Sequence, residues 1–197
     1  MYKKQIILQK IICFAALAVS ALVFLYALGL MTDLYDSLYP AMMDSSNIDD
    51  TWVPGSQIYY HMQPFNKQLL SYSIVMVLLS CLLFITSTHS RRRYYIGNVI
   101  ATGAFAAAGV LLSGWGHVQL DAFKTEFLTK VDFDELAFFA EMWETPYLDS
   151  TFWFDAHYVV LGLVVLVAVL LIANCAWKFS LMQAEKRLIE EGKKVSA

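Results

Sequence analysis

Long uninterrupted apolar stretches alternate with polar segments along this chain. Four stretches contain no Asp, Glu, Lys or Arg, and each is about as long as the roughly 20 residues that a helix needs to cross a bilayer. They are residues 11–30, 69–88, 95–116 and 158–177. Membrane-spanning strands would instead alternate apolar and polar residues over about ten positions. The pattern therefore predicts an all-α, polytopic four-helix transmembrane bundle.

The first long polar segment, residues 31–68, contains Pro40, Pro54 and Pro64 together with clustered Asp, Ser and Asn residues. Such residues favour turns and argue against a long helix. We therefore expect an ordered but irregular loop with short helical pieces.

The second long polar segment, residues 117–157, has a more helical pattern. Apolar residues recur every three or four positions from Leu120 to Val131, which predicts an amphipathic helix. Asp132 then carries a glutamate three positions later, as helix N-termini often do. A second short helix is expected from about Phe133 to Trp143, and both helices would lie in this loop.

Charge distribution predicts the orientation of the chain. The N-terminal segment, the short turn with Arg91, Arg92 and Arg93, and the tail at residues 178–197 hold 11 basic and 3 acidic residues, a net charge of +8. The two long loops hold 3 basic and 14 acidic residues, a net charge of −11. Because basic flanks stay in the cytoplasm, we expect both termini inside, both loops outside, and a plasma or inner membrane location.

Composition leaves little room for anything beyond the membrane domain. The chain has 197 residues, of which 58% are hydrophobic and 16% charged, against about 25% charged in soluble domains. We therefore expect residues 1–197 to form a single integral membrane domain. The first run could alternatively be a signal peptide, but it is longer than the usual apolar stretch of about 7–15 residues. An uncleaved membrane anchor is the favoured interpretation.

Small residues dominate the third apolar run. Gly97 and Ala101 are four positions apart, as are Ala104 and Ala108, and small residues at this spacing let membrane helices approach closely. We expect this helix to be central in the bundle, with a small groove for lipid or ligand as the alternative.

Two amides interrupt the apolar runs near the predicted inner surface. Asn98 lies in the third run and Asn174 in the fourth. A hydrogen bond between them is expected to join the two helices, and Thr102 could share it. Binding of an ion or substrate by these amides is the weaker alternative.

Three histidines fall on the predicted outer side. His117 ends the third run and His157 precedes the fourth, so they share a depth, and His61 could join them. Imidazoles with nearby carboxylates can bind zinc, but no H-x-x-H or H-E-x-x-H spacing is present. We expect interfacial polar residues, with no metal and no cofactor, and keep a metal site at these histidines as the alternative.

Large aromatic residues recur in the second loop and are candidates for contact with a partner or with the membrane rim. They are Phe123, Phe127, Phe139 and Trp143. Apolar groups on a segment that would otherwise face water usually mark a contact. Anchoring in the aromatic belt at the membrane surface is favoured over a protein-binding surface for a second aromatic set: Trp143, Tyr147, Phe152, Trp153 and Phe154.

No apolar run carries the charged residues or prolines that ion-coupled transporters usually place within the membrane. No nucleotide-binding or catalytic spacing is recognisable either. We expect a non-enzymatic accessory or scaffolding subunit of a larger membrane assembly, such as a transporter complex. Its partners would be the lipid bilayer and other integral membrane subunits or an extracytoplasmic protein, not nucleic acid. The alternative is a metal- or cofactor-binding redox or enzymatic membrane protein that uses the outer His and Asp residues.

Overall fold

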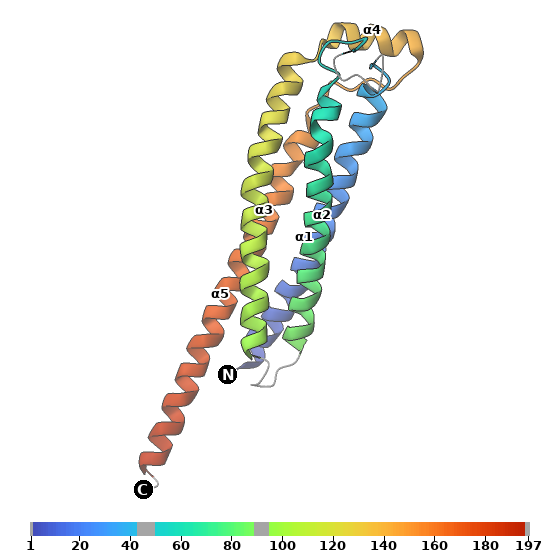
Figure 1. Ribbon diagram of the computed structural model, residues 1–197. Coiled ribbons are helices and arrows are strands. Elements are labelled where there is room, and N and C mark those ends of the chain that lie inside the picture. Colours follow the sequence, from blue (N-terminus) through green and yellow to red (C-terminus); the bar gives the residue numbers. More distant parts are fainter. Residues whose placement is uncertain (1, 43–49, 89–94, 196–197) are drawn as a thin grey trace. The chain divides into compact units, whose positions relative to one another are not determined.

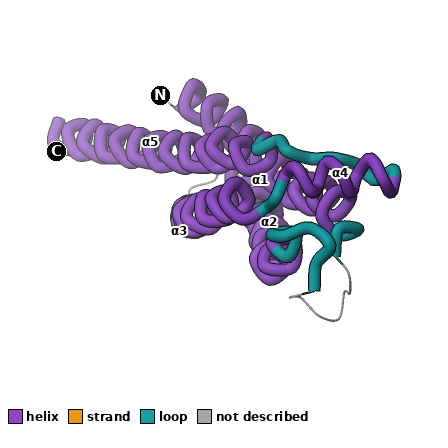
Figure 2. Tube along the Cα trace, turned by 90° about the horizontal axis from the view of Figure 1, so that it is seen from above, coloured by secondary structure: helices purple, strands orange, loops and turns teal. Residues whose placement is uncertain are grey.

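The computed structural model describes residues 2–42, 50–88 and 95–195. In these ranges the chain folds into helices α1 (Tyr2–Leu38), α2 (Ile58–Thr88), α3 (Tyr95–Lys130), α4 (Phe133–Trp143) and α5 (Phe152–Val195) (Figure 1). Helix dominates these parts of the chain, and short loops join the helices (Figure 2). Helices α1, α2, α3 and α5 are each long and apolar enough to cross a membrane. The protein is therefore all-helical, with four candidate membrane spans.

The helices are longer than the apolar runs that predict them. The amphipathic segment after Gly116 continues α3 without a break to Lys130, instead of forming a separate helix in a loop. The first loop is shorter than expected, because α1 reaches Leu38 and α2 begins at Ile58. Pro64 lies inside α2, so this proline does not end the helix as predicted. The turn with Arg91, Arg92 and Arg93, and His89 beside it, lies outside the described residues.

The chain divides into two compact units, each built from parts of the long helices. Unit 1 comprises Met1–Ser20, Met76–Leu111 and Leu163–Ala197. Its core is made of side chains from four helices, among them Ala16 of α1, Met76 and Leu83 of α2, Phe105 of α3 and Val164 of α5, all fully buried or nearly so.

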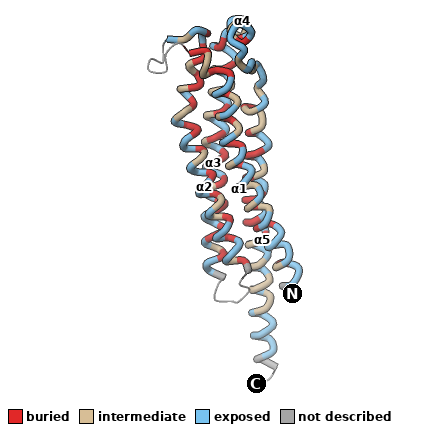
Figure 3. The backbone as a smooth tube through the Cα atoms, turned by 90° about the vertical axis from the view of Figure 1, so that its right-hand side faces the viewer, coloured by how far each residue is buried: buried red, intermediate tan, exposed pale blue. Residues whose placement is uncertain are grey.

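Unit 2 comprises Ala21–Val75 and Leu112–Gly162. It contains both segments predicted to be outer loops, and α4 lies crosswise to the long helices of this unit (Figure 1). Fully buried side chains include Leu34 of α1, Met62 of α2, Phe127 of α3, Leu136 of α4 and Phe154 of α5. In both units buried positions alternate with exposed ones along each helix (Figure 3), as expected for helices that pack on one face.

Loop residues 50–57 are fixed against the junction of α3 and α4 in unit 2. The backbone N–H of Asp132 donates to the carbonyl oxygen of Pro54 at 3.0 Å. Gly55 has a φ of +87°, and a Cβ there would lie 2.2 Å from the carbonyl oxygen of Lys130. Only glycine combines this backbone conformation with such a close approach, so Gly55 fixes the loop to α3.

Candidate functional site

Unit 1 contains a cluster of buried amides that links four helices. On α1, the Gln5 Nε2 group donates to Gln9 Oε1 at 3.1 Å and lies 3.3 Å from Asn174 Oδ1 of α5. Gln9 Nε2 donates to Asn98 Oδ1 of α3 at 2.6 Å, and Asn98 Nδ2 donates to Thr86 Oγ1 of α2 at 3.4 Å. We call these five residues the amide cluster.

The amide cluster differs in two ways from the expected pair of asparagines. Asn98 and Asn174 are joined through Gln9 and Gln5, not directly to each other. Thr86, not Thr102, shares the cluster. Interhelical hydrogen bonds of this kind are worth about 0.6–2 kcal/mol each in membrane proteins, so the amide cluster can hold the four helices of unit 1 in register.

Unit 2 contains a polar layer in which two of the three expected histidines meet. The His117 Nδ1 and His157 Nε2 atoms are 2.9 Å apart. His157 is buried, and its Nδ1 atom hydrogen-bonds to the carbonyl oxygen of Phe154. His61 lies elsewhere, paired with Glu126 at 3.0 Å.

Charged and hydroxyl groups surround the histidine pair on α3 and α5. Lys124 Nζ donates to Asp155 Oδ1 at 2.6 Å, and the Thr151 hydroxyl donates to the other carboxylate oxygen at 2.7 Å. These hydrogen bonds, that of Lys124 first, hold the pKa of the Asp155 carboxyl below its usual value. The Tyr158 hydroxyl donates to Asp121 at 3.1 Å. Each carboxylate of this layer thus has a donor.

In the part of the chain that the structure describes, a metal site would need at least three protein ligands. No group of three His, Cys, Asp or Glu side chains is placed there to hold a metal ion. The arrangement does supply a row of hydrogen bonds that ties α3 to the start of α5.

Aromatic and small residues near the ends of the apolar runs make close contacts within unit 2. A Cβ on Gly29 would lie 2.2 Å from the Trp153 ring, so α1 and the start of α5 are in close contact. Tyr26 donates its hydroxyl proton to the carbonyl oxygen of Trp153 at 2.7 Å, and the Trp153 indole donates to Asp33. On α3, Trp115 packs against Phe65 and Tyr72; membrane aromatic belts have this composition.

Helix α4 has the bounds that the sequence predicts, and its N-terminus has the expected cap. The Asp132 carboxylate accepts hydrogen bonds from the backbone N–H groups of Asp134 and Glu135 at 3.1 and 3.0 Å. The helix ends at Trp143, and the next residue, Glu144, has a left-handed backbone conformation with a φ of 53°. Leu136 and Ala140 are buried and attach one face of α4 to unit 2.

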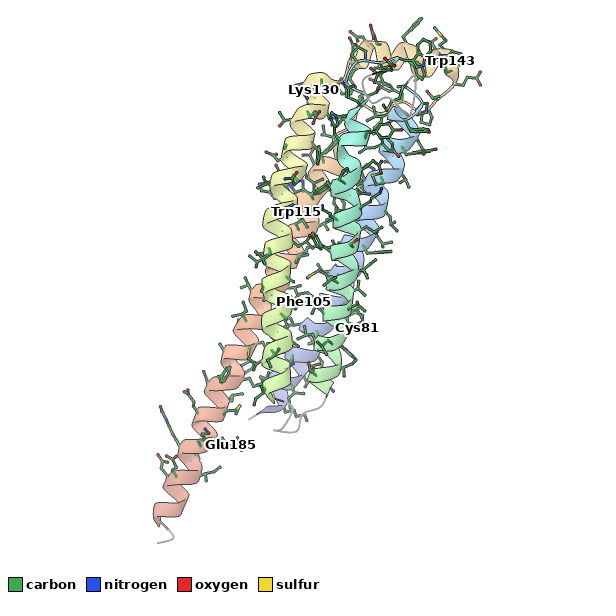
Figure 4. All side chains as sticks on the ribbon, in the orientation of Figure 1. Cys81, Phe105, Trp115, Lys130, Trp143 and Glu185 are labelled. Atoms are coloured by element: carbon green, nitrogen blue, oxygen red, sulfur yellow. The ribbon has the colours of Figure 1, made fainter. Side chains whose placement is uncertain are left out.

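Three large apolar side chains of α4 are exposed: Phe138 and Met142 lie on the side away from Leu136 and Ala140, and Trp143 is the last residue of the helix. Phe138 is 64% exposed, Met142 56% and Trp143 61%, and Figure 4 labels Trp143 at the end of the helix. We call these three residues the α4 face. Of these three residues only Trp143 was expected to make a contact, although the spacing of four between Phe138 and Met142 is readable from the sequence.

The four aromatic residues expected to make contacts differ in exposure. Trp143 is exposed, and Phe139 is half-buried with its ring centroid 6.3 Å from that of Trp143. Phe123 packs against Phe65, and Phe127 is fully buried between Phe133 and Phe154. Phe127 therefore belongs to the core and has no surface for a partner.

The small residues of α3 also fall on different sides. Ala101 is buried and Ala108 half-buried, whereas Gly97 and Ala104 are exposed. A helix that was expected to be central therefore has one face open in the structure, and Ala104 is not a close intrachain contact. Among the glycines of α3 in unit 1, Gly109 is closest to a neighbouring helix, since a Cβ there would lie 2.9 Å from Val164 Cγ1.

Comparison with known proteins returns no match: no protein-family model fits the chain, and no curated protein or solved structure matches it.

Proposed function

We propose that the chain is a non-enzymatic accessory or scaffolding subunit of a larger membrane assembly, and that the α4 face binds another protein of that assembly on the predicted outer side. The observation that supports this most is the exposure of Phe138, Met142 and Trp143 together on one helix. Buried aromatic anchors supply much of the binding energy of protein interfaces.

The height of α4 above the apolar run favours a protein over the membrane surface as its partner. Helix α3 continues from Gly116, where its charge-free run ends, to Lys130. At about 1.5 Å per residue this extension is about 20 Å long, whereas the headgroup region adds only about 5–8 Å on each side of the hydrocarbon core. Asp121 is the first charged residue after this run, and the part of α3 from Asp121 to Lys130 is still about 13 Å long. Helix α4 would then be too far from the bilayer for its aromatic residues to serve as an interfacial anchor.

Unit 2 is also built to present this surface rigidly. The Asp132 cap, the contact of Gly55 with Lys130 and the buried Leu136 and Ala140 attach α4 to the unit. A surface that is ordered before binding loses less entropy on association. A transporter complex is one assembly that would use a subunit with inert helices and a rigid outer surface.

Co-purification of the full chain in mild detergent tests this proposal. Replacing Phe138 and Trp143 together by Ser should release a stoichiometric partner, because aromatic residues at the centre of an interface cost about 2 kcal/mol or more each when truncated. The matched control is Phe152→Ser, since Phe152 is 62% exposed but lies at the start of α5, beside Trp153, and not on α4. Retention of the partner by the double variant would contradict the proposal, as would equal loss in the control.

A further inference from the structure

A shallow apolar groove of about 320 Å3 lies in unit 1 between α1 and α5. It is lined by Leu8, Ile11 and Ala15 of α1 and by Leu170, Ala173 and Trp177 of α5. Asn174 of the amide cluster lies in the same wall. The volume is at the lower end of the about 300–1,000 Å3 of small-molecule sites, and the carbon-rich lining suits one hydrocarbon chain.

Two lysines extend the walls of this groove at one end. Residues four apart on a helix are neighbours on its surface, so Lys4 lies one turn beyond Leu8 on α1 and Lys178 one turn beyond Asn174 on α5. The Gln5 Nε2 and Asn174 Oδ1 atoms are 3.3 Å apart, which places these parts of the two helices side by side. Lys4 and Lys178 therefore flank the same end of the groove.

The other two lysines of α1 lie away from the groove. At 100° per residue, Lys3 and Lys10 fall on the side of α1 opposite Leu8 and Ile11. Among the lysines of α1, Lys4 is thus the one on the groove side, and Lys3 and Lys10 provide a matched comparison.

We propose that this groove binds one anionic phospholipid, with an acyl chain along the apolar walls and the phosphate between Lys4 and Lys178. Basic pockets between membrane helices bind anionic headgroups in this way. The groove changes from apolar to cationic over one helical turn. An anionic phospholipid is complementary to it, because its apolar acyl chain leads to a negatively charged phosphate. The site is in unit 1 and is independent of the proposed partner surface on α4.

Titration of the purified full chain with phosphatidylglycerol and phosphatidylcholine, followed by native mass spectrometry, tests the charge at the site. We expect one saturable phosphatidylglycerol per chain, bound more tightly than phosphatidylcholine. Replacing Lys4 and Lys178 by Gln should weaken phosphatidylglycerol binding about twenty-five-fold, because each lysine near an anionic lipid is worth about a factor of five. The control variant, Lys3→Gln with Lys10→Gln, should bind as the unmodified chain does.

Filling the groove tests the acyl-chain position. Ala173→Trp should abolish saturable binding, whereas Ala176→Trp, at an exposed alanine that does not line the groove, should not. Helical content by circular dichroism identifies a variant that fails to fold, and Ala15→Leu then provides a second way to fill the groove. The proposal is wrong if both phospholipids bind equally, if the two double lysine variants behave alike, or if a folded groove-filled variant binds normally.

Discussion

Individual polar side chains in unit 1 show how an apolar bundle can specify one arrangement of its helices. The Gln5, Gln9, Asn98 and Asn174 side chains are all buried, and a buried amide without a partner costs about 1–3 kcal/mol. Sliding α1 by one turn relative to α3 and α5 would leave either Asn98 or Asn174 without its glutamine, because Gln5 and Gln9 are one turn apart. The amide cluster therefore acts against wrong registers more than it adds to the total stability.

Two of these residues could be predicted from the sequence and two could not. Asn98 and Asn174 interrupt charge-free runs and stand out as buried amides. Gln5 and Gln9 lie between Lys4 and Lys10, before the first run, and so resemble a solvated flank. Their burial depends on the α3 and α5 residues that face them, which the local sequence does not show.

A double-mutant cycle tests the amide cluster. Gln9→Leu and Asn98→Leu should each destabilise unit 1 by about 1–3 kcal/mol, because each leaves the other amide unsatisfied. The double variant should lose less than the sum, with a coupling of about 0.5 kcal/mol or more. Unfolding by SDS in mixed micelles, followed by circular dichroism, measures the three values, and strict additivity would contradict the described hydrogen bond.

The apolar periodicity of a helix decides which of its sides faces the core, and the residues that flank the helix decide where it ends. The bounds of α4 were predictable, since Asp132 caps the helix with its own side chain. The length of α3 was not, because the amphipathic pattern after Gly116 fits either a separate helix or a continuation. The exposed side of α3 was not predictable either, since its small residues occur on more than one face and the neighbouring helices decide which face packs.

Two glycines of α3 provide a matched test of helix packing. Gly109→Leu should destabilise unit 1 by about 1–3 kcal/mol, because even a Cβ at this position would lie 2.9 Å from Val164. Gly103→Leu has the same gain in helix propensity but nothing within 4 Å of its Cβ, so it should be neutral or stabilising. Thermal unfolding in detergent separates the two variants, and an equal effect of both would show that α3 does not approach α5 at Gly109.

The molecule as a whole combines four helices that are long and apolar enough to cross a membrane with a charge asymmetry that predicts its orientation. The four candidate spans were readable from composition, because each run is long, apolar and free of charge. A function was not readable in the same way, since exposed apolar residues such as Phe138 and Met142 belong to no motif that identifies a partner. Their significance depends on the distance of α4 from the apolar runs, which only the structure provides.

Accessibility labelling tests the orientation. In a variant without Cys13, Cys81 and Cys175, a cysteine at Ser150 should react in intact cells with a reagent that does not cross membranes. A cysteine at Ser196 should react only after permeabilisation. Neutralising Arg91, Arg92 and Arg93 should weaken this bias, because positive residues near helix ends set it. Labelling at position 196 from outside would overturn the predicted orientation.

Site-specific photo-crosslinking in native membranes most directly tests whether the α4 face binds a protein. A photoreactive residue at Met142 should give one discrete protein adduct, which Phe138→Ser should remove. The same probe at Leu111, an exposed position in the apolar run of α3, should react mainly with lipid. If the Met142 probe also reacts only with lipid, α4 lies in the membrane surface and the accessory-subunit account is contradicted.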